Sequence, residues 1–222
     1  MNQPIRPEIL SPAGDEERLR AALRFGADAV YVSGQSYGMR MGCANFDLDG
    51  LRRGAELTHS AGKKLYVTCN ILPRNRDMVA LPEYFRFLNS IGVDALIISD
   101  LGTMELAKEY APHCALHIST QFGVVNYATA AALYRMGASR VVLARELSLD
   151  EVRQIIRAGG FCAWGNLYVL FGALRYLQLS HKPGCQPRRM CPALPLEISD
   201  CGGNAPSITT NFRTRCRRYL SF

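Results

Sequence analysis

Polar side chains close several apolar runs in the first two thirds of this chain. Asn70 ends the run at 64–70, Asp100 ends the run at 95–100, and Gln121 follows the run at 116–120. Carboxylates, amides and guanidinium groups gathered at one edge of a parallel sheet can orient a substrate or relay protons. The residues that close these runs are Tyr31, Asn70, Asp100, Gln121, Arg145 and Glu146.

Two further candidates lie between the second and third runs. Arg40 could hold an anionic substrate through two parallel hydrogen bonds, although a solvated loop arginine is the alternative. Asn45 is a second candidate for the same pocket. Structural alternatives also apply to the first group, because Asp100 precedes Gly102-Thr103 and could cap a helix, and Arg145 and Glu146 could pair with each other.

Two other residue types could act as a base or a nucleophile. His117 lies within an apolar run, where an interior histidine is the favoured interpretation over a general base. Cys69 lies late in another run, where a buried cysteine acting as a small hydrophobe is favoured over a nucleophile. We find no H-E-x-x-H or G-x-S-x-G pattern that would mark a hydrolase.

The apolar runs are β-branched and apolar on both faces, which is typical of buried parallel strands. Helical spacing separates them, and the helical segments end at small turns such as Ala61-Gly62 and Met136-Gly137. The six predicted strands are 8–14, 27–32, 64–70, 95–100, 116–120 and 140–144. No phosphate-binding glycine fingerprint follows a strand, so we expect an α/β fold that is an incomplete TIM-type (β/α) barrel of about six units rather than a nucleotide-binding open sheet.

The composition changes near residue 160. Residues 1–160 hold 18 basic and 17 acidic side chains, whereas residues 161–222 hold 8 and 2 and also five of the eight cysteines. The later residues show neither helical nor strand periodicity. We therefore expect an incomplete barrel over 1–158 and an irregular tail over 159–222.

Four segments resemble the collagenase-like peptidase family, peptidase family U32, in order and spacing. They are Ser11–Gly14, Gly26–Tyr31, His117–Gln121 and Arg140–Ser148, and Met39-Arg40 with Asn45-Phe46 matches the loop after the second strand. The resemblance implies a barrel enzyme, either a peptidase or a protein for oxygen-independent hydroxylation of tRNA, ribosomal RNA or a quinone ring. It also implies RNA and prephenate as partners, and a 4Fe-4S cluster held by cysteines after the seventh strand of intact members.

That cysteine segment is missing from the printed reading frame. Shifting the frame by one nucleotide across residues 160–198 permits codons for the family's cysteine-containing segment, so we hypothesise a base gained or lost around Arg153–Gly160. Cys185 and Cys191 would then be products of the shift and not a metal pair. We expect the truncated chain to hold no cofactor and to be inactive; the alternatives are a peptidase and a non-catalytic remnant or binding protein.

The beginning of the chain carries no pattern of a signal peptide, and no apolar run approaches the ~20 residues needed to span a bilayer. We expect a cytoplasmic, bacterial-type protein that does not associate with membranes.

Overall fold

Seven parallel strands form one curved sheet in which each strand pairs with the next along the chain. The computed structural model describes residues 8–39, 45–159 and 167–168, all within one compact unit, Met1–Ala173. Sequential parallel pairing is the arrangement of a (β/α) barrel. The strands are β1 (Leu10–Pro12), β2 (Ala29–Ser33), β3 (Lys64–Cys69), β4 (Ala95–Ile98), β5 (Ala115–Ile118), β6 (Arg140–Val142) and β7 (Leu167–Tyr168).

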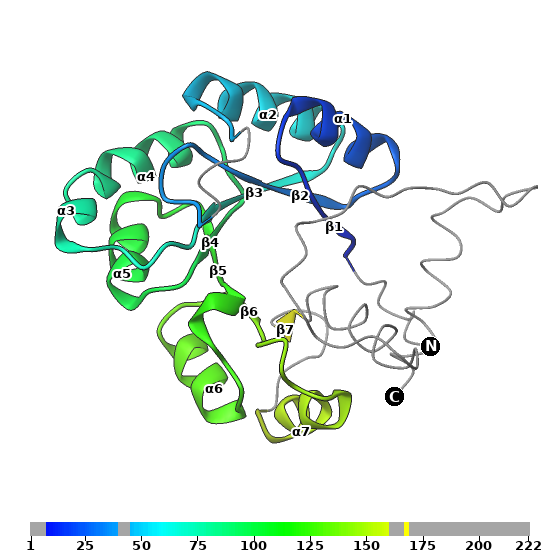
Figure 1. The fold of residues 1–222 in the computed structure, drawn as a ribbon, viewed down its shortest axis with the longest axis vertical. Coiled ribbons are helices and arrows are strands. Elements are labelled where there is room, and N and C mark those ends of the chain that lie inside the picture. The colour runs from blue at the N-terminus through cyan, green and yellow to red at the C-terminus, as the bar shows by residue number, and fades with distance from the viewer. Residues whose placement is uncertain (1–7, 40–44, 160–166, 169–222) are drawn as a thin grey trace, which may run out of the picture. The chain divides into compact units, whose positions relative to one another are not determined.

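Helices connect the strands and cover the outer face of the sheet (Figure 1). They are α1 (Glu16–Arg24), α2 (Leu48–Ser60), α3 (Asn75–Met78), α4 (Leu81–Ser90), α5 (Leu101–Tyr110), α6 (Tyr127–Arg135) and α7 (Leu149–Gly159), with the 3-10 helix η1 (Thr120–Phe122) after β5.

Short sequence signals set the helix boundaries. Asp15 caps α1 by accepting a hydrogen bond from the Arg18 backbone N–H at 2.8 Å, and Asp47 caps α2 in the same way. Gly62 and Gly92 follow α2 and α4 with φ values of 66° and 76°, a left-handed backbone that favours glycine. These signals allow each helix to stop within a few residues of the next strand.

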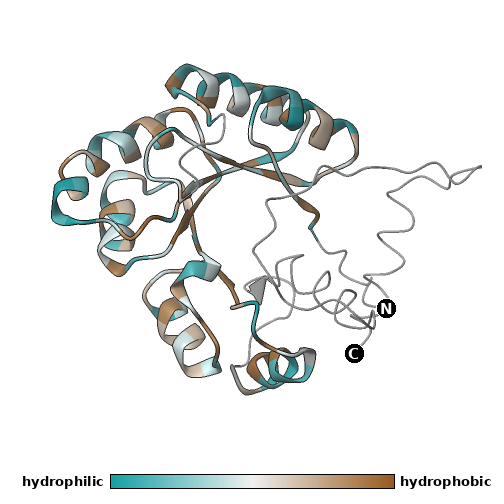
Figure 2. Cartoon of the chain, viewed as in Figure 1, coloured by the Kyte–Doolittle hydropathy of each residue, from teal (hydrophilic) through white to brown (hydrophobic). Residues whose placement is uncertain are grey.

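The main hydrophobic core lies between the sheet and its helices. Val30, Val67 and Leu96 point outward from the strands and are completely buried there, together with Leu19 of α1 and Phe85 of α4. Figure 2 shows predominantly hydrophobic strands and helices with hydrophilic outer surfaces. This layer arises because strand side chains alternate between the two faces of the sheet.

The inner face of the sheet carries a polar network at the beginnings of the strands. Arg140 of β6 donates to Glu8, just before β1, at 2.7 Å and 3.4 Å, and the Tyr66 hydroxyl donates to the same carboxylate at 2.9 Å. The Arg140 and Glu8 side chains are only 14% and 20% exposed. The network therefore links the first and sixth strands across the inside of the curve.

The six strands expected from the sequence are confirmed, and each strand end lies within two residues of the expected position. A seventh strand, β7, lies within the segment that we expected to be irregular, and it pairs with β6 through Val141 and Val142. Residues 160–166 and 169–222 of the expected tail lie outside the described residues.

A loop crowded by two tyrosines follows β2. The Tyr84 ring lies 5.1 Å from the Tyr37 ring, and a Cβ added to Gly34 would lie 2.3 Å from the Tyr84 hydroxyl oxygen. That hydroxyl is buried and has no hydrogen-bond partner among the described residues. A buried polar group without a partner lowers stability by ~1–3 kcal/mol.

We predict that Arg140→Met lowers the free energy of unfolding by ~2–3 kcal/mol, because it removes the cation from the partly buried Glu8 carboxylate. Urea unfolding measures the change. Lys108→Met, which removes the exposed pair with Glu105, serves as control and should cost less than ~1 kcal/mol. Adding Glu8→Gln to Arg140→Met should recover part of the loss, and equal costs for the Arg140 and Lys108 variants would contradict the prediction.

We predict that Tyr84→Phe raises the free energy of unfolding by ~1 kcal/mol, because it removes the buried hydroxyl and keeps the ring that packs on Tyr37. Tyr84→Leu is the matched control and should destabilise the protein by leaving a cavity. A destabilised Tyr84→Phe variant in thermal or urea unfolding would show that the hydroxyl is hydrogen-bonded in the native protein.

Candidate functional site

The carboxyl ends of β2 to β6 and the loops that follow them share one edge of the sheet (Figure 1). In barrels of this type the reactive groups lie at this edge. The residues predicted from the sequence have different positions here: some hold loops together, some cap helices, and some extend into solvent.

Asn70 joins two of the loops at this edge. It follows β3 directly, is half-buried, and its Oδ1 accepts a hydrogen bond from the Met39 backbone N–H at 3.2 Å. The Ile71 backbone N–H donates to the Tyr37 carbonyl at 3.2 Å. The end of β3 therefore positions the loop after β2, which leads toward Arg40; Arg40 itself lies outside the described residues.

Asp100 caps a helix, which was the alternative to a role in the substrate pocket. Its Oδ1 accepts hydrogen bonds from the Thr103 backbone N–H at 2.8 Å and from the Thr103 hydroxyl at 3.2 Å. These bonds satisfy orphan donors at the start of α5. Asp100 thus has a structural role that explains its presence without a substrate.

Tyr31 is placed differently from our expectation. It does not close β2, because the strand continues to Ser33, and Tyr31 pairs in register with Tyr66 in the middle of the sheet. Its half-buried side chain packs against the inner-face cluster of Ala29, Tyr66 and Ala95. The β-branched run predicted the strand, but it did not show that Ser33 extends it.

Asn45 lies next to the end of β2. It is half-buried and precedes Phe46, which forms an isolated bridge to Gly34. The Phe46 backbone N–H donates to the Ser33 carbonyl at 3.0 Å. The backbone at Asn45 therefore lies next to the carboxyl end of β2.

Gln121, Arg145 and Glu146 are exposed at the same edge. Gln121 lies in η1, and its backbone N–H donates to the Ser119 hydroxyl at 3.3 Å. Arg145 and Glu146 form a turn after β6, and the described part of the chain contains no ion pair between them. Their side chains are therefore open to solvent.

A polar network at the opposite end of the strands was not predicted from the sequence. Tyr66, Glu8 and Arg140 are connected by hydrogen bonds, and the His117 ring meets the Tyr66 ring edge-on at 4.7 Å. Burial, the Arg140 charge and the Lys64 charge lower the pKa of His117 to about 3, so its imidazole is neutral at physiological pH. Opposite charges at the starts of the first and sixth strands were the available signal.

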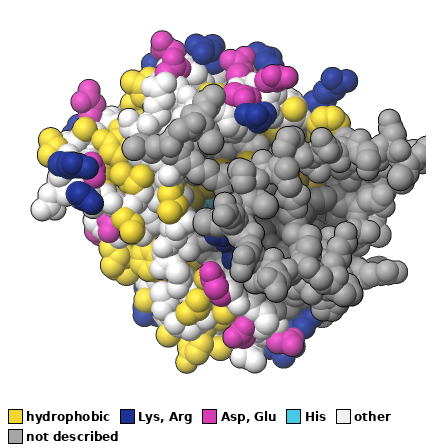
Figure 3. All heavy atoms as spheres, in the orientation of Figure 1, with side chains coloured by type: hydrophobic (Ala, Val, Ile, Leu, Met, Phe, Trp, Pro, Cys, Tyr) yellow, Lys and Arg dark blue, Asp and Glu magenta, His cyan; other side chains and the backbone are white. Residues whose placement is uncertain are grey.

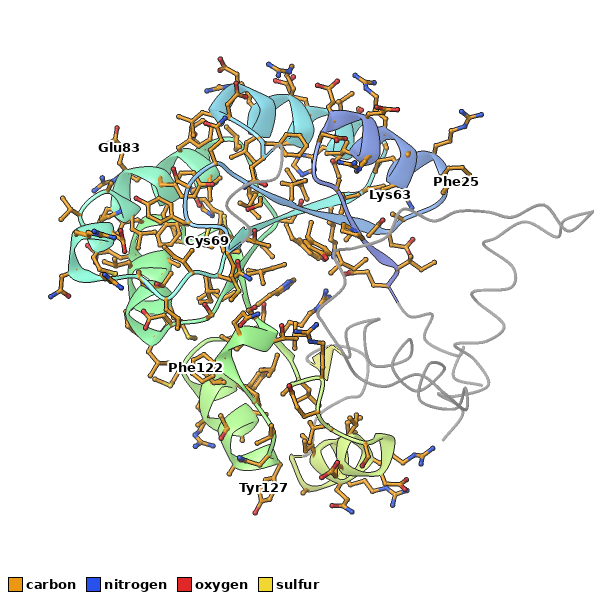
Figure 4. The ribbon with its side chains drawn as sticks, viewed as in Figure 1. Phe25, Lys63, Cys69, Glu83, Phe122 and Tyr127 are labelled. Atoms are coloured by element: carbon orange, nitrogen blue, oxygen red, sulfur yellow. The ribbon has the colours of Figure 1, made fainter. Side chains whose placement is uncertain are left out.

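The described cysteines do not fit an iron–sulfur site. Cys69 and Cys114 are free and buried, and burial raises the pKa of both thiols, that of Cys114 to about 12. Cluster ligation requires thiolates. Cys69 lies in the core between β3 and the helices, as a small hydrophobe (Figure 4), and within the described ranges no cluster of three metal-binding side chains occurs.

Hydrophobic side chains gather on the face seen in Figure 3 over α3, α4 and α5. Leu72 precedes α3 and Val79 follows it, and both are exposed apolar residues, at 76% and 82% exposure.

No helix in the described ranges is both long and apolar enough to cross a membrane.

Comparison with known proteins identifies related sequences. The tRNA hydroxylation protein P of Escherichia coli is 40% identical over 151 residues, which cover 68% of this chain and 33% of that protein. A 23S rRNA 5-hydroxycytidine synthase of Escherichia coli is 33% identical over 209 residues, which cover 91% of this chain and 31% of that protein. This second alignment necessarily extends past residue 163.

A solved structure of a U32 peptidase matches the fold with a TM-score of 0.59 at 15% identity, covering 71% of this chain and 67% of that one. The chain spans about a third of the length of the curated relatives that it matches. The model of the family described as peptidase family U32 matches residues 14–163. This match covers more than half of the sequence, and the chain belongs to peptidase family U32.

Proposed function

We propose that this chain carries the first part of the barrel of a protein that hydroxylates tRNA. The observation that carries the proposal is the identity of 38% and 40%, over about 150 residues, to tRNA hydroxylation proteins of Bacillus subtilis and Escherichia coli. The ribosomal RNA relative supports RNA as the class of substrate. Prephenate is the proposed hydroxyl source, and the cytoplasm, where tRNA is found, is the proposed location.

The described residues do not form the site of a cysteine peptidase. A cysteine peptidase needs a thiolate beside a histidine base. Here Cys69 faces the helices and its pKa is raised by burial, whereas His117 belongs to the inner-face network. Among the described residues, no cysteine and histidine form a nucleophile and base pair.

The residues at the carboxyl edge would bind and orient the RNA base. Enzymes that modify a base take it out of its stack and hold it in a pocket. Asn70 would fix the loop that leads to Arg40, and the exposed Gln121 and Arg145 side chains would contact the base or its phosphate. We assign no step to an iron–sulfur cluster, because the described residues do not hold one.

We further propose that the gene's reading frame is interrupted around Arg153–Gly160. The change in composition near residue 160 and the compatible shifted codons support the proposal. The alignment with the ribosomal RNA relative beyond residue 163 is the observation that favours an uninterrupted frame.

Sequencing the gene across the codons for residues 150–165 tests the frame. We expect one base more or fewer than the printed sequence requires, with the family's cysteine segment in the corrected frame. If the printed codons are confirmed, the shift is a property of the gene itself, and the 222-residue chain should add no oxygen to tRNA. A contrary result would be tRNA hydroxylation by the 222-residue chain as printed.

A bacterial strain that lacks its own tRNA hydroxylation protein tests the activity. We predict that the frame-corrected gene restores hydroxylated nucleosides in tRNA, measured by mass spectrometry, and that Asn70→Ala lowers them by roughly tenfold or more through loss of loop position. Asn126→Ala is the matched control: it removes the N-cap of α6, costs ~1 kcal/mol of stability, and should leave hydroxylation unchanged at permissive temperature.

Two results would contradict the proposed function. One is frame-corrected protein that adds no oxygen to tRNA although it is soluble. The other is cleavage of gelatin by that protein, lost on substitution of a carboxyl-edge residue, which would establish the peptidase alternative.

A further inference from the structure

The inner face of the sheet is hollow near the beginnings of β3 to β6. Barrel interiors are usually filled by layers of bulky branched side chains. Here the strands contribute Ala95 and Ala115, and a hollow of about 260 Å³ lies beside them. Its lining also contains Lys64, Tyr66, Asp94, His117, Ser139 and Arg140.

His117 lines this hollow without a hydrogen bond. Its side chain belongs to a residue that is 5% exposed, and its ring forms an edge contact with Tyr66 but no hydrogen bond with any described residue. The His117 ring nitrogens are not among the fully enclosed polar atoms that lack a partner, so they keep access to the hollow and can hydrogen-bond to a molecule there.

The acidic groups around the hollow already have partners. Glu8 accepts from Tyr66 and Arg140, and Asp94 Oδ2 accepts from the Leu65 backbone N–H at 2.8 Å and contacts His59 Nε2 at 2.9 Å. Lys64 lines the hollow, is exposed to solvent, and has no ion-pair partner in the described ranges. The unused hydrogen-bonding capacity is therefore largely that of donors, which favours a ligand rich in acceptor oxygens.

We propose that this hollow is a binding site for a small oxyanion, a carboxylate or phosphate group held by Lys64 and the His117 imidazole. The site lies at the amino ends of the strands, opposite the carboxyl edge at which RNA would bind, and it does not depend on the proposed hydroxylation. Lys64, Asp94, Glu8, Tyr66 and Arg140 are the titratable or charged groups around His117.

A bound anion should also change the titration of His117. Burial and the Arg140 and Lys64 charges lower its pKa to about 3. An anion in the hollow opposes both positive charges, so the pKa of His117 should rise toward its ordinary value.

Inorganic phosphate, added to the full 222-residue chain, is the probe. We expect saturable movement of the His117 imidazole signal in NMR spectra, with a dissociation constant in the millimolar range. Lys64→Met should weaken binding by about tenfold, the effect of losing one charge-assisted contact. Lys63→Met is the matched control, since Lys63 (Figure 4) pairs with Asp28 at 3.3 Å and does not line the hollow; it should leave the affinity unchanged.

Three results would overturn the proposal: a His117 signal that phosphate does not move, an unchanged affinity in Lys64→Met, or equal weakening by both lysine substitutions, which would indicate general charge attraction. Thermal unfolding with and without phosphate gives an independent measurement, because a ligand that binds only the folded state raises the unfolding temperature. Either protein variant must unfold cooperatively without phosphate for the comparison to count.

Discussion

The ion pair between Glu8 and Arg140 is the interaction on which the curved sheet depends. The two residues are 132 positions apart, and the sheet ladder otherwise links each described strand only to its neighbours. Bringing such distant segments together costs chain entropy, and a partly buried pair with two hydrogen bonds offsets part of that cost. Because Tyr66 also donates to Glu8, the middle strand β3 is held to the same point.

The same network determines the chemistry of the interior. Arg140 balances Glu8 and at the same time disfavours a second positive charge on His117. Burial acts in the same direction, since a charged imidazole would lose its hydration. The amino end of the interior therefore combines a paired carboxylate with a histidine that stays neutral well below the pH at which a free histidine gains its proton.

The sequence predicted local structure better than long-range contacts. Apolar periodicity and capping residues act within one strand or one helical turn, so the strands and the role of Asp100 as a cap could be predicted. Tyr31 was misplaced because the run that ends at Val32 gives no sign that Ser33 continues the strand. The pairing of Glu8 with Arg140 could not be predicted, because it depends on the curvature of six strands and on their register.

The polar residues at the carboxyl edge fall into three groups: those that cap helices, one that holds a loop, and those whose side chains are exposed. A strand that leads quickly into a helix needs an N-cap, so Asp47, Asp100 and Asn126 are explained by the helices that they begin. Asn70 holds the loop after β2, because its Oδ1 accepts a hydrogen bond from the Met39 backbone N–H. Among the described residues, the groups left to meet a substrate are long, exposed side chains from the loops after β5 and β6, chiefly Gln121 and Arg145. Such side chains can turn toward a ligand without breaking a helix cap or a loop contact, which the capping residues cannot do.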